Sequence, residues 1–403
     1  MVPAKGQPES AAISTDGTRV AMMHREFSAS DQVTTEVIEV RDVQSGREVS
    51  TFSLPAMDWT QKKAQYYVAP SLRYCDGGKY LLAYNGPDTL YVLDASSFHR
   101  HATIVLSELR LRLVRETKGT PFPEVNLYSQ VAVDCSASSP IAALGVWADL
   151  GVVSLKLFDL DKGVETADLG GIFEGRNERY TGDGLAISPD GSKLALGTWE
   201  FDKGVGSTVE VVATRTRAFL KKLPLGDAFM REHQLAFAGE GALVVGEPEC
   251  QPNGKCDTRQ LPRGRTLRVW DFGRNGAVRT LGWPEAETYR YFGASATGDV
   301  VFGYTGAESY CNSCNGGNGE LKVNDARFTV WDRDSGRVVA RSPQLKAEQP
   351  KCPWLQVMGS CAEDEQAPEL QLSANGKAVL VFWKGSFPPR DNDSGTLEVF
   401  RLP

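Results

Sequence analysis

The sequence is poor in histidine and contains no long apolar run. Only four of its 403 residues are histidines, which leaves little material for histidine-based acid–base chemistry or metal binding. No segment approaches the roughly 20 consecutive apolar residues that an α-helix needs to cross a bilayer. The first residues, Met1–Lys5, also lack the apolar core of a signal peptide. We therefore expect no transmembrane segment, and any export signal would have been removed from this chain.

The chain also lacks an excess of positive charge and any long helical stripe. Its formal net charge is −7 and its isoelectric point is near 5.4, so the basic surface of a nucleic-acid-binding protein is absent at the level of net charge. No apolar pattern of helical period is long enough to cover a parallel sheet. Forty glycines and 21 prolines suit short strands joined by turns. The composition predicts an all-β protein whose partner is not nucleic acid.

What the sequence does contain is a repeated β-hairpin. In its clearest copy, residues 328–340, an alternating strand ends at Trp331-Asp332, Asp334-Ser335-Gly336 makes a turn, and Val338-Val339 begins a return strand. Six further copies of the alternating strand lie at 37–42, 90–94, 155–159, 209–212, 267–271 and 397–400. Seven copies indicate one repeat array rather than two or three separate domains.

A second hairpin precedes each of these copies, so that every repeat can be divided into four strands, A to D. The fourth repeat is the clearest, with strands A, B, C and D at 185–188, 193–197, 209–212 and 218–223. Equivalent A–B hairpins are predicted at 12–21, 72–83, 131–144, 235–245, 293–302 and 370–382. The repeats therefore predict seven four-stranded antiparallel units.

These motifs resemble the WD-repeat family of β-propellers, specifically its bacterial members. Val269-Trp270-Asp271 and Val330-Trp331-Asp332 match the Trp-Asp signature, Phe158-Asp159 is a relaxed version, and Ser188-Pro189-Asp190-Gly191 matches the bacterial turn. The Gly-His dipeptide of eukaryotic members is missing. The resemblance implies a seven-bladed β-propeller. We expect a single domain, 1–403, with blades at 11–54, 69–106, 129–171, 184–225, 233–283, 291–343 and 368–403.

The seventh repeat ends after its C strand, at Phe400-Arg401-Leu402-Pro403. In the family, an N-terminal segment supplies the outer strand of the last blade, and residues 1–9 are the spare segment here. Pro3 and Pro8 limit this segment to a short edge strand.

Inserted sequence is concentrated in the B-to-C and D-to-A connections, which open on the same face of a propeller. Examples are 107–128, 247–265, 304–327, 344–367 and 383–394. The A-to-B and C-to-D turns are short. We therefore predict one face with long loops, and long loops in compact domains are frequently functional.

Eight cysteines are present, and six form three local pairs: Cys250/Cys256, Cys311/Cys314 and Cys352/Cys361. The remaining two, Cys75 and Cys135, both align with Pro189 at the end of strand A, on adjacent blades, where a bridge is geometrically reasonable. Four disulfides would place the protein in an oxidising compartment, periplasmic or secreted. The alternatives are a cytoplasmic protein with free thiols, or a zinc site built from Cys250, Cys256, Cys311 and Cys314.

Two further motifs have an ordinary structural interpretation. Asp391-Asn392-Asp393-Ser394-Gly395 has alternating oxygen ligands but lacks the distal glutamate of a calcium loop, and is typical of a turn. His233 begins an A strand at the predicted channel mouth, where an acid or base could act, yet no partner residues can be assigned to it. We predict no catalytic residue, metal or cofactor.

Aromatic residues gather in or beside the long connections. The sequence therefore favours a non-catalytic, monomeric propeller that binds a protein or peptide on its loop-rich face. The residues predicted to contact this partner are Tyr67, Tyr128, His233, Tyr291, Trp354 and Trp383. The alternative is a propeller enzyme of the lyase or lactonase type, with its site on the same face.

Overall fold

The computed structural model describes residues 8–28, 33–54, 71–84, 89–105, 130–147, 153–169, 178–200, 205–224, 235–247, 266–272, 277–282, 288–311, 320–343, 369–382 and 397–402. In this part of the chain the one helical element is a short 3₁₀ turn, Asp76–Gly78, and no helix could cross a membrane. The fold separates into two compact units. The N-terminal unit is Glu9–Leu235, and the C-terminal unit is Ala236–Pro403 with Met1–Pro8.

The N-terminal unit contains four antiparallel sheets, each a meander in which consecutive strands pair. The strands of the first two sheets are β1 (Pro8–Ile13), β2 (Arg19–Ser28), β3 (Val33–Asp42), β4 (Glu48–Ser53), β5 (Ser71–Cys75), β6 (Tyr80–Tyr84), β7 (Thr89–Asp94) and β8 (Arg100–Val105). Those of the next two are β9 (Gln130–Cys135), β10 (Ile141–Trp147), β11 (Val153–Asp159), β12 (Val164–Asp168), β13 (Glu178–Ile187), β14 (Lys193–Glu200), β15 (Val205–Ala213) and β16 (Phe219–Pro224).

The C-terminal unit continues the same pattern. Its strands are β17 (Leu235–Ala238), which begins at the boundary, β18 (Ala242–Glu247), β19 (Thr266–Asp271), β20 (Ala277–Gly282), β21 (Thr288–Ala294), β22 (Val300–Cys311), β23 (Glu320–Asp332), β24 (Val338–Arg341), β25 (Glu369–Leu372), β26 (Ala378–Phe382) and β27 (Leu397–Arg401). They form two four-stranded sheets and, within the described residues, a three-stranded one, β25-β26-β27.

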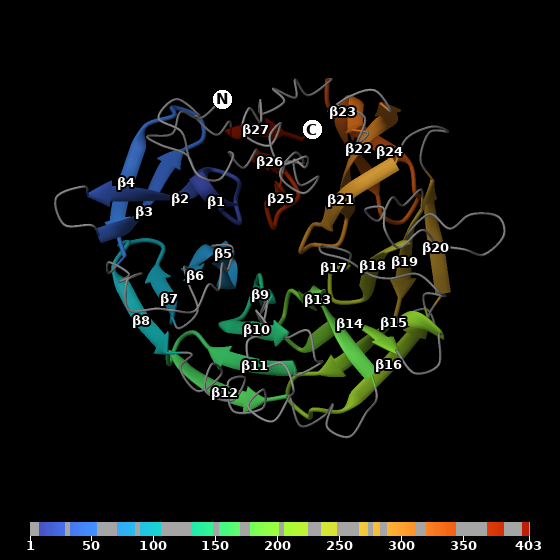
Figure 1. Ribbon diagram of the computed structural model, residues 1–403, viewed down its shortest axis with the longest axis horizontal. Coiled ribbons are helices and arrows are strands. Elements are labelled where there is room, and N and C mark those ends of the chain that lie inside the picture. The colour runs from blue at the N-terminus through green and yellow to red at the C-terminus, as the bar shows by residue number, and fades with distance from the viewer. Residues whose placement is uncertain are drawn as a thin grey trace. The chain divides into compact units, whose positions relative to one another are not determined.

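These successive meanders are the blades of an all-β, seven-bladed propeller, which confirms the predicted fold class. Within each unit the A strands lie on the inner side and the D strands on the outer side (Figure 1). Strand C of the last blade, β27, is present as predicted. The predicted closure of that blade by residues 1–9 lies mostly outside the described residues; Pro8 and Glu9 belong to β1.

Apolar residues of neighbouring blades pack against one another to make the core. Between the second and third blades, Tyr80 and Leu82 of β6 belong to one buried cluster with Leu144 and Phe158 of the next blade. Trp331, from the Trp-Asp signature, has no exposed surface and packs in a cluster with Val244 and Val269 of the fifth blade. Blade-to-blade packing thus uses the apolar residues that define the strand period.

Blade 6 contradicts one part of the predicted loop pattern. The segment 304–327, predicted as a long loop, continues β22 and β23 as a paired ribbon: Thr305 lies opposite Arg327, and Cys311 lies opposite Glu320. The ladder shifts register once, between Thr305 and Ala307. Antiparallel pairing satisfies the backbone of an inserted segment, so the insertion lengthens the hairpin, and the connection shrinks to 312–319.

The fourth blade also departs from prediction, because its strand A begins at Glu178 rather than Leu185. Glu178, Arg179 and Tyr180 pair with the end of β14, and the register then shifts before Leu185 resumes the ladder opposite Leu196. A bulge of this kind absorbs extra residues without ending the strand.

Candidate functional site

Most residues predicted to bind a partner lie outside the described residues: Tyr67, Tyr128, His233, Trp354 and Trp383. Tyr291 lies in β21, with its backbone opposite Tyr304. Five of the paired cysteines also lie outside the described residues: Cys250, Cys256, Cys314, Cys352 and Cys361. Cys311 is described and ends β22. The segment 391–395, considered for calcium, is also outside the described part.

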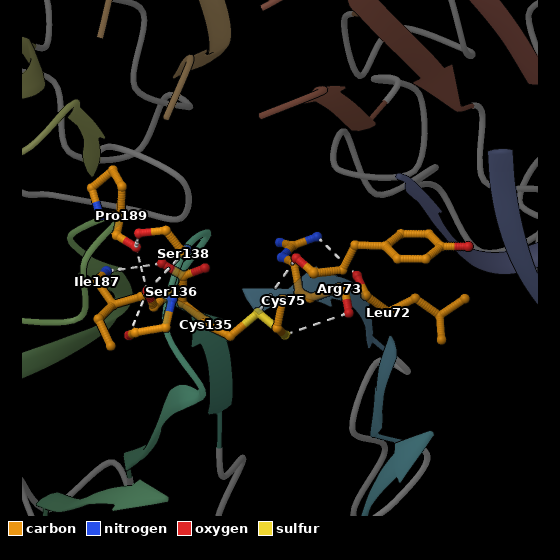
Figure 2. Close-up of a disulfide and its surroundings, with 11 residues drawn as sticks. Leu72, Arg73, Cys75, Cys135, Ser136, Ser138, Ile187 and Pro189 are labelled. Carbon is orange, nitrogen blue, oxygen red and sulfur yellow. Dashed lines mark hydrogen bonds between the residues drawn. A yellow bond between two sulfur atoms is a disulfide. The ribbon is translucent and has the colours of Figure 1, made fainter. Parts of the chain in front are cut away.

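The structure does show the remaining cysteine pair, on the inner strands of the second and third blades. Cys75 ends β5, Cys135 ends β9, and they form a disulfide with a Cα–Cα distance of 5.7 Å across a sequence separation of 60 residues (Figure 2). This confirms the predicted bridge between adjacent blades.

The two cysteines do not, however, occupy the position of Pro189, and they are not equivalent to each other. Cys75 lies opposite Tyr80, the first residue of its B strand, whereas Cys135 lies opposite Ala142, the second residue of its B strand. Ser136, one residue further on, bonds through its N–H to Ile141 O just as Ser188 N bonds to Lys193 O. By register, Cys75 therefore corresponds to Ser188, and Cys135 to Ile187.

A buried serine holds the A–B turn in several other blades. Ser14 Oγ accepts the N–H of Arg19 at 2.9 Å and donates to the Asp16 carboxylate at 2.6 Å. The same pair of bonds recurs with an acid or amide two residues after the serine, in Ser188/Asp190 and Ser373/Asn375. Ser188 and Ser373 have no exposed surface. The side chain thus satisfies a backbone donor that the tight turn leaves inside the protein.

The C–D turns use an aspartate in a similar way. An Oδ1 atom accepts the backbone N–H three residues later in Asp42, Asp94, Asp159 and Asp332. Asp332 is the aspartate of the Trp-Asp signature. Hydrogen bonds from the Ser96 hydroxyl and the Ser97 N–H hold the pKa of the Asp94 carboxyl well below its usual range. The signature aspartate is therefore a turn residue.

In the N-terminal unit, hydrogen bonds join the A–B turns of neighbouring blades. Thr15 Oγ1 donates to Gly77 O at 2.9 Å, and Gly77 N donates to Ala137 O at 2.5 Å. Ser138 N and Oγ both donate to Pro189 O, each at 2.8 Å (Figure 2). The first four blades are thus linked through one row of turns, which we call the turn row (14–18, 76–79, 136–140 and 188–192).

Beside the disulfide, the inner strands contain a partly buried acid, Asp134, and a nearby cation, Arg73. Asp134 Oδ2 accepts the N–H of Ile187 at 2.9 Å, which ties β9 to β13 of the next blade. Burial raises the pKa of the Asp134 carboxyl, although the positive charge of Arg73 and the N–H groups that it accepts act in the opposite direction. Arg73 donates to its neighbour's carbonyl, Leu72 O, at 3.2 Å. Asp134 thus acts mainly as a connector between inner strands.

A polar cluster joins the second and third blades at the outer side. The Asp161 carboxylate accepts hydrogen bonds from Lys79 Nζ and Tyr80 Oη, both at 2.5 Å, and His101 Nε2 donates to Asp161 O at 2.9 Å. The Lys79 bond lowers the pKa of Asp161, and the Asp161 bond raises that of Lys79. Both shifts favour the charged forms at neutral pH, so this pair is an ion pair and is not poised for proton transfer.

No set of three His, Cys, Asp or Glu side chains that could hold a metal ion occurs in the part of the chain that the structure describes.

The sequence predicted only part of the turn row and of the contacts of Arg73 and Asp134 beside the disulfide. Ser188-Pro189-Asp190-Gly191 indicated the turn, but nothing in the sequence showed that Pro189 O accepts bonds from the blade before it.

The sequence matches no protein-family model and no curated protein. Solved structures do resemble the fold. Hydrazine synthase of Kuenenia stuttgartiensis has a TM-score of 0.54 and 13% identity, covering 100% of this chain and 97% of that one. U3-55K has a TM-score of 0.51 and 11% identity, covering 99% and 96%. The β-propeller domain of Cps50 (Swd1) of Myceliophteria thermophila has a TM-score of 0.51 and 12% identity, covering 94% of each chain.

The likeness shows the fold alone. At these identities no binding or catalytic residue can be transferred, and one of the similar structures has the name of an enzyme. The choice between binding and catalysis must come from this chain's own residues.

Proposed function

We propose that this chain is a non-catalytic binding propeller of the bacterial WD-repeat type. It acts as a monomer outside the cytoplasm and holds a protein or peptide on the end of its blades where the long connections lie. Nucleic acid is not the partner, because the net charge is −7.

The observation that carries this proposal is the uneven length of the strand connections. In every sheet the A-to-B connection is short, as in 14–18, and so is each C-to-D connection, as in 43–47. The long connections, such as 106–129, 248–265 and 342–368, all join strands at the opposite end of their sheets. Long connections concentrated at one end are typical of a recognition surface on a rigid scaffold.

The disulfide between Cys75 and Cys135 supports the proposed location, since such bonds persist in oxidising compartments. We propose that the three local pairs, Cys250/Cys256, Cys311/Cys314 and Cys352/Cys361, are also oxidised and fix the long connections. Thiol alkylation of the denatured but unreduced protein should then label no cysteine. Labelling of these six would leave Cys75–Cys135 as a single bridge and remove this part of the proposal.

Partner binding is assigned to Tyr67, Tyr128, His233, Tyr291, Trp354 and Trp383. Replacing Trp354 and Trp383 together with alanine should abolish capture of the partner by the immobilised protein, because buried aromatic anchors dominate binding energy. The matched control is Arg47→Ala with Arg337→Ala, two exposed residues of C–D turns. Arg333 is a poor control, because its side chain bonds to Ala238 O in the adjacent blade.

Loss of capture in the arginine control with retention in the tryptophan variant would move the binding surface to the other end of the blades. Turnover of a small substrate that disappears specifically in His233→Ala would place the protein among the propeller enzymes.

A further inference from the structure

The second blade is built differently from its neighbours at the A–B turn. In five of the six other blades the register position before this turn is a buried serine: Ser14, Ser136, Ser188, Ser295 and Ser373. In the fifth blade strand A ends at Ala238. In the second blade this position is Cys75, whose sulfur is bonded to Cys135 of the next blade. A residue that usually closes its own turn is here used to hold the neighbouring blade.

The turn that follows has one hydrogen bond of its own, from Lys79 N to Asp76 O at 3.0 Å, and is also bonded to the third blade. Asp76 N donates to Ser136 O at 2.9 Å, and Gly77 N donates to Ala137 O at 2.5 Å. Asp76 also has a φ of 48°, an unfavourable value for a residue other than glycine. Since the strained turn depends on contacts with the third blade, its conformation depends on how closely β5 and β9 are kept together.

Both sulfur atoms already lie beside backbone oxygens that could accept a thiol hydrogen. Cys75 Sγ is 3.6 Å from Arg73 O, and Cys135 Sγ is 3.7 Å from Tyr74 O. A thiol is a weak donor and behaves largely as a small apolar group when buried. Each thiol formed on reduction has a backbone oxygen close by, so the dithiol form can be accommodated between β5 and β9.

We propose that Cys75–Cys135 is a reversible redox latch between the second and third blades. A thiolate of a dithiol reductant attacks Cys135 Sγ, which is the less buried of the two cysteines, and the S–S bond breaks as Cys75 leaves as a thiolate and takes a proton. The second thiol of the reductant then releases Cys135. The protein gains two electrons and two protons, and the reductant becomes a disulfide.

Opening the latch changes the inner strands as well as the turn. Cys135 follows Asp134 in β9, and the Asp134 carboxylate accepts the N–H of Ile187 in β13. A shift of β9 away from β5 is therefore transmitted to the fourth blade. The reduced state keeps the fold, since the apolar cluster of Tyr80, Leu144 and Phe158 still joins the blades.

The test is residue-resolved amide hydrogen exchange on the full-length protein, before and after treatment with dithiothreitol. Reduction should speed exchange at Asp76 and Gly77 about tenfold or more, and oxidation should reverse this change. Exchange at Ala378 in the seventh blade, whose N–H is bonded to Ser373 Oγ, should stay unchanged. The effect of dithiothreitol should be absent from the double variant Cys75→Ser/Cys135→Ser, which retains the other cysteines. This variant should also protect the Tyr80 N–H better than Cys75→Ala/Cys135→Ser, because serine restores the usual turn acceptor.

Unchanged exchange at Asp76 and Gly77 after proven reduction would overturn the latch. Loss of the whole fold on reduction would show a structural staple instead, and resistance of the native disulfide to the dithiol would exclude a reversible device.

Discussion

Ser188 Oγ accepts the backbone N–H of Lys193 at 2.9 Å and closes the turn formed by Pro189, Asp190 and Gly191. The serine side chain is fully buried, whereas Asp190 is exposed. The bond therefore satisfies a donor that water cannot easily reach, and it links the end of strand A to the start of strand B.

Replacing this serine should destabilise the protein out of proportion to its size. Ser188→Ala leaves the Lys193 N–H without its acceptor, and we expect a loss of about 1–2 kcal/mol in the free energy of unfolding. Urea unfolding measures this loss. Ser192→Ala, at an exposed position in the same turn, should change the midpoint little; equal effects of the two substitutions would refute the role assigned to Ser188.

Gly298 should be intolerant of any side chain. Its φ is +80°, and a Cβ atom built there would lie 2.8 Å from Ala238 O of the adjacent turn. Because that neighbour is backbone and cannot swing aside, Gly298→Ala should cost about 1–3 kcal/mol.

Gly241 offers a matched control in the turn of the preceding blade. A Cβ atom there would meet nothing within 4 Å, so Gly241→Ala should be neutral or slightly stabilising. Thermal unfolding of both variants decides the matter, and a Gly298→Ala variant as stable as the parent would show that the two turns are not in close contact.

Acid should weaken the C–D turns in a predictable pH range. The hydrogen bonds from Ser96 and Ser97 lower the pKa of Asp94 in the folded protein, so its charged form stabilises the fold fully above the unfolded value of about 3.9. That contribution is lost as the pH falls from there towards the folded pKa. Carboxyl titration by NMR should place the Asp94 midpoint below the ordinary range.

Removing the hydroxyl groups of Ser96 and Ser97 provides the control for this prediction. In the double variant Ser96→Ala/Ser97→Ala, the Asp94 midpoint should rise towards 3.9, because the hydroxyl bonds are gone while the backbone N–H groups remain. A midpoint at the ordinary value in both proteins would mean that the turn does not depend on the charged carboxylate.

The seven repeats could be predicted because strand period and turn residues are local properties. The Phe328–Asp332 strand, its turn and the return strand at Val338 were all visible in the sequence, and the structure has them. The Cys75–Cys135 bridge was also predicted, because both cysteines lie at the ends of A strands in adjacent blades, although the exact alignment was wrong.

The errors arose where local signals could not fix register. The Asp76-Gly77 dipeptide suggested that Cys75 matched Pro189, but in the second blade this dipeptide follows the strand directly and forms a 3₁₀ turn. The extension of β22 and β23 was missed because its residues alternate weakly and were assigned to a loop. Pairing partners such as Cys311 and Glu320 are set by the ladder that precedes them.

That extended hairpin shows where the molecule can change in length. β22 and β23 run well past β21 and β24, yet Phe302 still lies opposite Val330, and Val330 opposite Ala340, as in an unextended blade. Each blade thus sets its register from its own turns, so an insertion between B and C strands leaves the pairing of every other blade untouched. The 312–319 connection is therefore a natural place to graft a foreign peptide onto this scaffold.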